Sequence, residues 1–249
     1  MKLIPKRLKQ APLIEAIWQV QFEPTSELPV GDLLPGMLYA ALRGRYPKLQ
    51  LQRLPTADMP ASVTQLDPNL RHMAKFCLED PESTLLFQIG DRVITLNSRY
   101  PYIGWNNFKA EILALIQVIE QSQLVPTPLQ HALRYIDLLT IEPAPNLSSL
   151  QLSLRLGEFN TQAKPLQMRI ELPDGDYLHV VQIATPAQAT LPHGTQSGTI
   201  VDLETSCVGV LSGWDTIKTQ IEPLHERLKA LFFENILTPE AIARMEPEY

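Results

Sequence analysis

Six arginine and tyrosine side chains form the set in this sequence best suited to binding. Arginine and tyrosine are enriched at binding hot spots, where the guanidinium and phenol groups combine apolar contact with hydrogen bonding. If the predicted strands pair as described below, these side chains meet and contact a ligand or partner. The alternative is that the tyrosines pack a connection and the arginines are surface groups. The predicted binding set is Arg92, Arg99, Tyr100, Tyr102, Arg134 and Tyr135.

Acidic side chains offer a second chemistry. Asp202 and Glu204 alternate along a predicted strand, and Thr95 and Asn97 hold the equivalent places in an earlier one. Carboxylates on one sheet face are the groups from which a metal-dependent hydrolase is built. A solvent-exposed polar sheet face is the simpler interpretation, and we favour it.

Asp174 and Asp176 flank Gly175. Two carboxylates around a glycine are compatible with a metal-binding loop. A hairpin turn is the alternative, because glycine takes the positive φ angle that tight hairpin turns need. We favour the turn.

The standard catalytic and cofactor motifs are missing. The histidines show no spacing typical of metal ligands, and no glycine-rich phosphate-binding loop or nucleophile elbow occurs. Cys77 and Cys207 are predicted to be buried, because no neighbouring base or cation points to an activated thiol. The sequence therefore predicts no catalytic residue, no metal ligand and no cofactor.

Hydrophobic periodicity predicts the elements that position these residues. Strands are indicated where apolar residues alternate, helices where they recur every three to four positions, and a flexible loop over residues 186–198. Residues 146–159 are ambiguous. The predicted strands are Leu13–Phe22, Met73–Leu78, Leu85–Ile89, Arg92–Leu96, Leu133–Ile141, Gln167–Leu172, Tyr177–Ala184 and Thr199–Glu204, and the predicted helices are Leu33–Tyr46, Trp105–Gln121, Trp214–Phe233 and a short one after Thr238.

The order of elements suggests a duplication. Gly104-Trp105 and Gly213-Trp214 each open a long helix and share the apolar spacing that follows. We predict an α+β fold of two tandem halves, residues 1–130 and 131–249, packed as one unit. Together they would form a curved antiparallel sheet with both long helices on one face, in a TATA-binding-protein-like or helix-grip-like arrangement. The opposite sheet face would be open for binding.

Three segments resemble a family of bacterial proteins. They are Pro-Leu-Ile-Glu at residues 12–15, Tyr-Pro-Tyr-Ile-Gly-Trp-x-x-Phe at residues 100–108 and Leu-Arg-Tyr-Ile-Asp at residues 133–137. The chain resembles a sporadically distributed family of about 250 residues whose function is not established. The resemblance implies a bacterial, cytoplasmic accessory protein and assigns no catalytic residue. Asp137 stands where the family pattern leads us to expect asparagine.

Composition narrows the function further. The chain has 249 residues with 21 basic and 27 acidic side chains, a net charge of −6. That charge argues against a nucleic-acid partner, and no apolar run is long enough to span a membrane. We expect a non-enzymatic binding or adaptor protein that holds a protein or a small ligand on the open sheet face. A metal-dependent hydrolase and a nucleic-acid-binding saddle are the alternatives, and the oligomeric state is open, a homodimer included.

Overall fold

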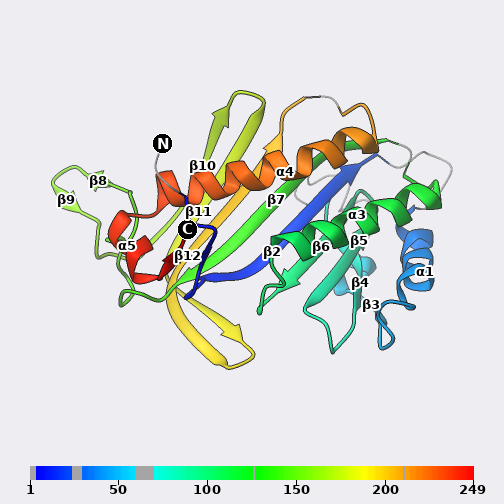
Figure 1. Cartoon of the computed structure of the whole chain (residues 1–249), viewed down its shortest axis with the longest axis horizontal. Helices are drawn as coiled ribbons and strands as arrows, with labels where there is room; N and C mark the ends of the chain where they lie inside the picture. Colours follow the sequence, from blue (N-terminus) through cyan, green and yellow to red (C-terminus); the bar gives the residue numbers. More distant parts are fainter. Residues whose placement is uncertain (1–3, 24–29, 60–69, 126, 210) are drawn as a thin grey trace. The chain divides into compact units, whose positions relative to one another are not determined.

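The protein has an α+β fold built on a large antiparallel sheet, as the sequence predicts (Figure 1). A computed structural model describes residues 4–23, 30–59, 70–125, 127–209 and 211–249. Within these residues the sheet has nine strands in the order β10-β11-β12-β7-β2-β6-β5-β4-β3. They are β2 (Leu13–Phe22), β3 (Gln50–Arg53), β4 (Ala74–Glu79), β5 (Leu85–Gly90), β6 (Val93–Arg99), β7 (Pro128–Leu139), β10 (Leu166–Asp174), β11 (Tyr177–Leu191) and β12 (Gly194–Cys207).

The remaining described elements are short strand pairs and helices. β1 pairs with β13, and β8 pairs with β9. The strands are β1 (Arg7–Leu8), β8 (Arg155–Leu156), β9 (Phe159–Asn160) and β13 (Pro247–Glu248). The helices are α1 (Val30–Leu42), the 3-10 turn η1 (Pro55–Asp58), α3 (Trp105–Ser122), α4 (Trp214–Ala230), the π-helical η2 (Leu231–Ile236) and α5 (Pro239–Arg244).

The chain divides into two compact units, each assembled from separated segments. Unit 1 comprises Met1–Ala16, Leu133–Ser206 and Glu222–Tyr249. Unit 2 comprises Ile17–Ala132 and Cys207–Ile221. We describe each unit by itself below.

Unit 2 follows the sequence pattern closely. β2 has the predicted bounds, and its apolar side chains Trp18, Val20 and Phe22 are fully buried. α3 buries the predicted stripe on one face, as an amphipathic helix on a core does. The stripe is Phe108, Ile112, Leu115, Ile116 and Ile119.

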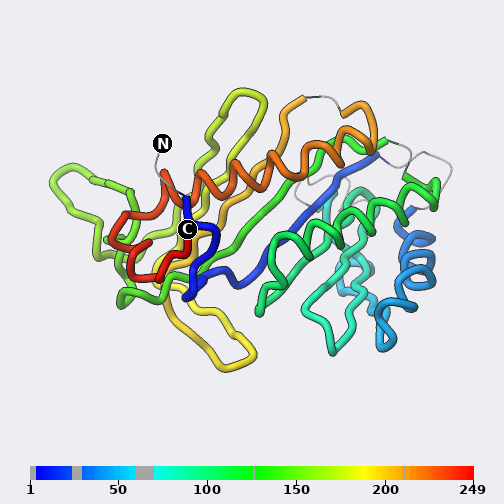
Figure 2. Tube along the Cα trace, viewed as in Figure 1, coloured from blue at the N-terminus to red at the C-terminus, as the bar shows by residue number. Residues whose placement is uncertain are grey.

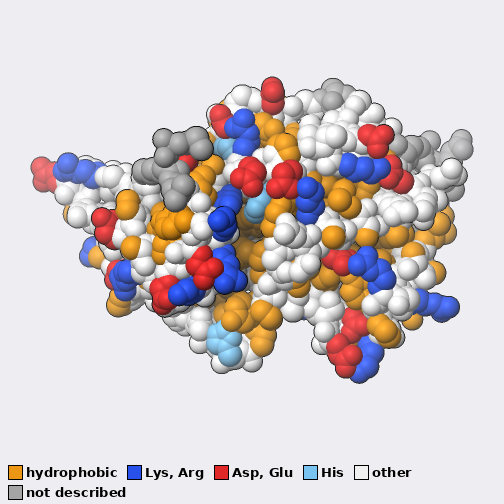
Figure 3. Space-filling view, viewed as in Figure 1, with side chains coloured by type: hydrophobic (Ala, Val, Ile, Leu, Met, Phe, Trp, Pro, Cys, Tyr) orange, Lys and Arg blue, Asp and Glu red, His pale blue; other side chains and the backbone are white. Residues whose placement is uncertain are grey.

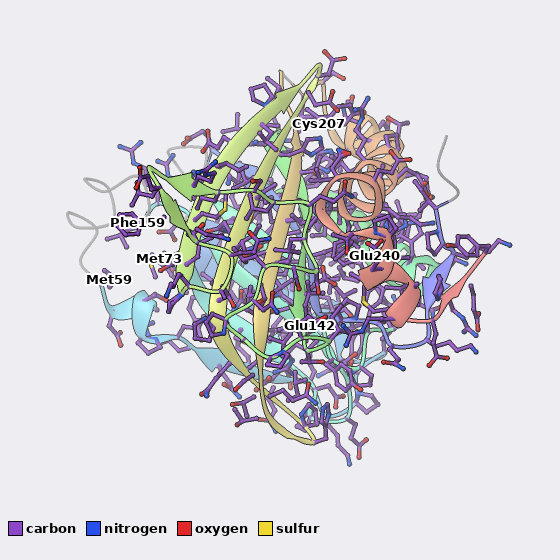
Figure 4. The ribbon with its side chains drawn as sticks, turned by 90° about the vertical axis from the view of Figure 1, so that its left-hand side faces the viewer. Met59, Met73, Glu142, Phe159, Cys207 and Glu240 are labelled. Carbon is purple, nitrogen blue, oxygen red and sulfur yellow. The ribbon has the colours of Figure 1, made fainter. Side chains whose placement is uncertain are left out.

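Unit 1 places the second half of α4 and the short α5 beside the ends of the chain. Thr238 caps α5 as its sequence indicates, since its Oγ1 accepts a hydrogen bond from the backbone N–H of Ala241 at 3.2 Å. Glu142, labelled in Figure 4, pairs with Arg244 at the end of α5. In Figure 2 the blue and red ends of the tube run together, because β1 pairs with β13.

The prediction of a flexible loop over residues 186–198 is wrong. β11 runs to Leu191 and β12 starts at Gly194, so the two strands form a long hairpin around a short turn. The outer part of this hairpin is exposed or half-buried and is rich in small and polar residues. It is ordered by strand pairing and by contacts such as Thr190 to Thr195, whose hydroxyl oxygens lie 3.3 Å apart. Such a segment lacks the apolar alternation by which a strand is recognised.

The two Gly-Trp pairs share their local geometry but differ in burial. Gly104 and Gly213 have φ angles of 85° and 132°, and a tryptophan begins the helix after each. Trp214 is buried and its Nε1 donates to the carbonyl oxygen of Val125 at 3.3 Å, whereas Trp105 is half-buried. The duplication of the two halves stays a prediction.

Candidate functional site

Four polar side chains form a row across neighbouring strands of unit 1, and we call them the polar row. Arg169 on β10 lies opposite Gln182 on β11. Gln182 donates from Nε2 to Oδ2 of Asp202 on β12 at 3.2 Å. Asp202 in turn accepts from Arg134 on β7, from Nε at 2.7 Å and from Nη2 at 2.5 Å. The row therefore joins β10, β11, β12 and β7, the four strands that precede β2 in the sheet order.

Strand alternation places the polar row on the sheet face away from α4. Successive side chains of a strand point to opposite faces. Tyr135 points toward α4, because its hydroxyl oxygen lies 2.7 Å from Nδ1 of His225 on that helix. The preceding residue, Arg134, therefore points to the other face. The polar row therefore lies on the face of these strands opposite α4, where the sequence predicts a binding surface.

The Arg134–Asp202 pair is the strongest interaction of the row. Two parallel N–H···O bonds join the planar guanidinium to both carboxylate oxygens, the geometry that arginine–carboxylate pairs favour. The Asp202 side chain is 10% exposed and the Arg134 side chain 34%. The hydrogen bonds that Arg134 donates to Asp202 raise the pKa of Arg134 above its usual value, so this arginine is permanently charged. Among the described residues, no group accepts a hydrogen bond from the third guanidinium nitrogen, Nη1 of Arg134.

Glu204 lies beside this pair. Burial raises the pKa of the Glu204 carboxyl, and the nearby charges of Arg134 and Arg169 oppose that shift. A shallow hollow of about 460 Å³ opens next to the row. It is lined by Gln167, Met168, Arg169, Gln182, Ile183, Ala184, Ile200 and Asp202. The hollow presents both hydrogen-bond donors and acceptors on a partly apolar floor.

The structure departs from the favoured interpretation of the acidic residues as a solvated face. Asp202 is 7% exposed and Glu204 is half-buried. At the places that the sequence makes equivalent in unit 2, Thr95 and Asn97 are also buried, and Thr95 Oγ1 donates to Oδ1 of Asn97 at 2.8 Å. Neighbouring strands and the side chains upon them remove these groups from water, an effect that a single strand pattern does not reveal.

The predicted binding set is distributed over both units. Arg134 and Tyr135 belong to unit 1, where they occupy opposite faces of β7 and contact different partners. The other four belong to unit 2 and mostly have local partners there. Arg92 pairs with Glu23, Arg99 Nη2 lies 3.2 Å from Glu79 Oε2, Tyr100 is 36% exposed, and Tyr102 packs edge-on against Phe108 with ring centroids 5.9 Å apart.

The Asp174-Gly175 segment is a turn, as favoured from the sequence. Gly175 has a φ of 58° in the two-residue turn between β10 and β11. Asp174 pairs with Arg227 on α4, whose guanidinium carbon lies 4.0 Å from the ring centroid of Tyr177. These contacts attach the hairpin to the helix and so fix the strands that carry half of the polar row.

The sequence patterns did not identify several polar groups of these strands. Gln182 and Arg169 carry no motif, and only the pairing of β10 with β11 brings them together. Asp137, 4% exposed, has its pKa raised to about 8, mainly by burial and further by the charge of Asp202. Asp137 lies on the same face of β7 as Tyr135, and no spacing in the sequence indicates that it is buried there.

Metal-ligand side chains, thiols and helix hydropathy were compared in the parts of the chain that the structure describes. There, no three His, Cys, Asp or Glu residues group closely enough to hold a metal ion. Cys77 and Cys207 are both buried free thiols, and burial raises the pKa of Cys77 to about 11; Cys207 is labelled at the end of β12 in Figure 4. No described helix is long and apolar enough to cross a membrane.

The surface charge is mixed. On the face shown in Figure 3, acidic and basic side chains are interspersed and no large field of one sign is visible. No protein-family model and no curated protein matches this sequence. The case for a function therefore depends on the geometry of the polar row.

Proposed function

We propose that the protein is a non-enzymatic binding or adaptor protein that holds a protein segment or a small ligand over the polar row. The observation that carries the proposal is the half-exposed Arg134, held in place by Asp202 beside a hollow. A guanidinium oriented by a buried carboxylate is a rigid donor, and rigidity lowers the entropic cost of binding. Its Nη1 would donate to a carbonyl, carboxylate or phosphate oxygen of the ligand.

The metal-dependent hydrolase has less support. Both oxygens of Asp202 already accept hydrogen bonds from Arg134, and burial raises the pKa of Glu204, which disfavours the ionised form that a metal requires. A nucleic-acid-binding saddle is disfavoured by the net charge of −6. We also propose a cytoplasmic location, which the two buried free thiols support.

Native mass spectrometry of protein purified gently from its own host tests the proposal. We expect the wild-type chain to retain a partner or a small-molecule mass at fixed stoichiometry. The Arg134→Gln variant should lose that mass, because the oriented donor is removed. Arg45→Gln is the matched control, since Arg45 is also a partly exposed arginine in an ion pair, with Glu111 of unit 2. Circular dichroism of each variant verifies the fold.

Three outcomes decide between the alternatives. Loss of the bound mass in Arg134→Gln alone supports the polar row. Equal retention in both variants, or a bare chain in every sample, contradicts it. A thermal shift with divalent cations that disappears in Asp202→Asn would favour the hydrolase.

A further inference from the structure

β10 is a long edge strand. It stands at one end of the nine-strand order, and no other strand in the described residues pairs with its outer side. All of its nine residues are exposed or half-buried, and Ile170 and Leu172 are each 39% exposed. Proteins usually protect such an edge, because it offers free backbone groups to another strand. We propose that β10 pairs antiparallel with β10 of a second copy, about a two-fold axis at Ile170, to form a homodimer.

The backbone groups needed for this pairing face outward. The turn at Gly175 and Asp176 has two residues, and Asp174 pairs with Tyr177 across it. In such hairpins the closing pair exchanges both ladder hydrogen bonds, and bonding alternates along the strand. The even-numbered residues of β10 therefore bond to β11, and the odd-numbered ones direct N–H and C=O outward. Pro173, which has no N–H, belongs to the outward set, where an edge strand tolerates proline.

The side chains of β10 are complementary to themselves. An axis at Ile170 sets Arg169 opposite Glu171 of the second copy, and Glu171 opposite the other Arg169. Within one copy these two residues form an ion pair, from Arg169 Nη1 to Glu171 Oε1 at 2.7 Å, and both side chains are about half exposed. Opposite charges directly across an antiparallel pair stabilise it. The dimer would therefore add a cross-strand charge pair on each side of the axis.

Charge also selects this register. A two-fold axis perpendicular to the sheet must pass through a residue position, so the nearest alternatives centre on Arg169 or on Glu171. Each of these would place a charged side chain directly opposite its own copy, and like charges there are destabilising. The register at Ile170 is also the one that covers apolar groups, because the two Ile170 side chains meet and Met168 faces Leu172.

The expected interface is small. One strand pair lies at the low end of protein–protein interface sizes, so we expect dissociation in the micromolar range, about 1–100 µM. The proposal does not depend on what the open face binds, since it uses the edge of β10 and not the Arg134–Asp202 pair.

Sedimentation velocity across that concentration range, with charge variants, gives the first test. Glu171→Arg places two arginines opposite each other on both sides of the axis, and we expect at least tenfold weaker association. Arg169→Glu should have the same effect, and the double swap Arg169→Glu/Glu171→Arg should restore dimerisation. Arg155→Glu is the matched control, because Arg155 is an exposed arginine of β8, which pairs with β9 and not with β10. Thermal unfolding of each monomer verifies that the variants are folded.

Disulfide trapping gives a second test that reports the register. Ile170 is bonded to β11, so across the axis it occupies a non-hydrogen-bonded pair, where the Cα atoms are about 4.5 Å apart and within disulfide reach. Ile170→Cys should form a covalent dimer on mild oxidation. Leu172→Cys is the control, because in the dimer it faces Met168 and should form no covalent dimer. The wild-type chain measures the background of covalent dimer that the buried Cys77 and Cys207 form on oxidation.

The outcomes are distinct. A dimer that is weakened by each charge reversal, restored by the swap and trapped by Ile170→Cys confirms the proposal. A monomer at every concentration, or a dimer that no β10 variant affects, overturns it. Trapping by Leu172→Cys instead of Ile170→Cys would overturn the register.

Discussion

The two ends of β7 bury ionisable side chains under very different conditions. His131, in unit 2, is 1% exposed and is hydrogen-bonded on both ring nitrogens. Trp18 Nε1 donates to His131 Nδ1 at 3.4 Å, so the proton of the neutral ring is on Nε2, which donates to Gln220 Oε1 at 2.9 Å. Asp137, in unit 1, is 4% exposed, and its carboxyl lies near the like charge of Asp202.

The difference teaches how one strand can carry both a hydrogen-bonded ring and a carboxyl beside a like charge. Burial lowers the pKa of His131 to about 4 and raises that of Asp137 to about 8, so both are mainly uncharged at pH 7. A satisfied buried hydrogen bond is close to neutral or favourable, whereas a carboxyl whose pKa is raised by folding lowers the stability once it ionises. We therefore expect His131 to stabilise the fold and Asp137 to weaken it.

Replacing His131 by leucine should have the largest effect. The substitution leaves Trp18 Nε1–H and the side chain of Gln220 without their partner, and each orphaned group costs about 1–3 kcal/mol. We expect a loss of about 2–4 kcal/mol in the free energy of unfolding, measured by urea titration. His193→Leu, at an exposed turn, should change it by less than about 0.5 kcal/mol. Equal effects of the two substitutions would contradict the inference that the hydrogen bonds of His131 stabilise the fold.

Asp137→Asn should stabilise the protein at pH 8. In the folded protein the pKa of Asp137 is about 8, against 3.8 for the free group, so unfolding releases a proton between these values. We expect a gain in the free energy of unfolding at pH 8, which disappears near pH 4. Asp176→Asn, at the exposed turn, is the control and should be neutral at both pH values. A destabilised Asp137→Asn would show that the carboxylate has a favourable role.

The pH profile separates the two groups by the sign of their slopes. The folded His131 has a pKa of about 4 against 6.5 when free, so its contribution makes stability rise with pH across that window. Asp137 makes stability fall between about pH 4 and 8, because the folded state binds the extra proton. Each slope is at most about 1.4 kcal/mol per pH unit. The contributions of these two groups to the free energy of unfolding should cancel up to about pH 6.5. From there to pH 8 the free energy of unfolding should fall, and Asp137→Asn should abolish that fall.

Gln220→Ala should give the smallest effect. It removes the acceptor of the His131 proton, a single hydrogen bond at a half-buried position, for which we expect about 1 kcal/mol. Because that bond raises the pKa of His131 against the effect of burial, its loss should lower the pKa further. NMR titration of the imidazole measures the shift. An unchanged or increased pKa would show that Gln220 does not support the ring.

Local patterns predict much of the fold. The alternation in Leu13–Phe22 gives β2 with its observed bounds, and the apolar stripes of α3 and α4 are buried as their spacing indicates. These features are encoded within a few turns or strand repeats, so one segment suffices to identify them. The hairpin beyond Thr185 is the exception, because its order comes from pairing with β12 and not from its own pattern.

The candidate site depends on neighbours that are distant in sequence. Arg134 and Asp202 entered separate hypotheses from the sequence, since their positions are 68 residues apart. Only the adjacency of β7 and β12 makes them one pair. The burial of Asp137 likewise depends on what covers its strand face, and no spacing in the sequence contains that information.

The pairing of β1 with β13 has a consequence for the order in which the chain folds during synthesis. Unit 2 receives its last segment at Ile221, whereas unit 1 still needs Glu222–Tyr249. Arg7 can meet Glu248 only after Glu248 has left the ribosome. Domains generally fold as units while translation proceeds. The residues of β1 must therefore wait for those of β13, and every segment of unit 2 is synthesised before unit 1 can close.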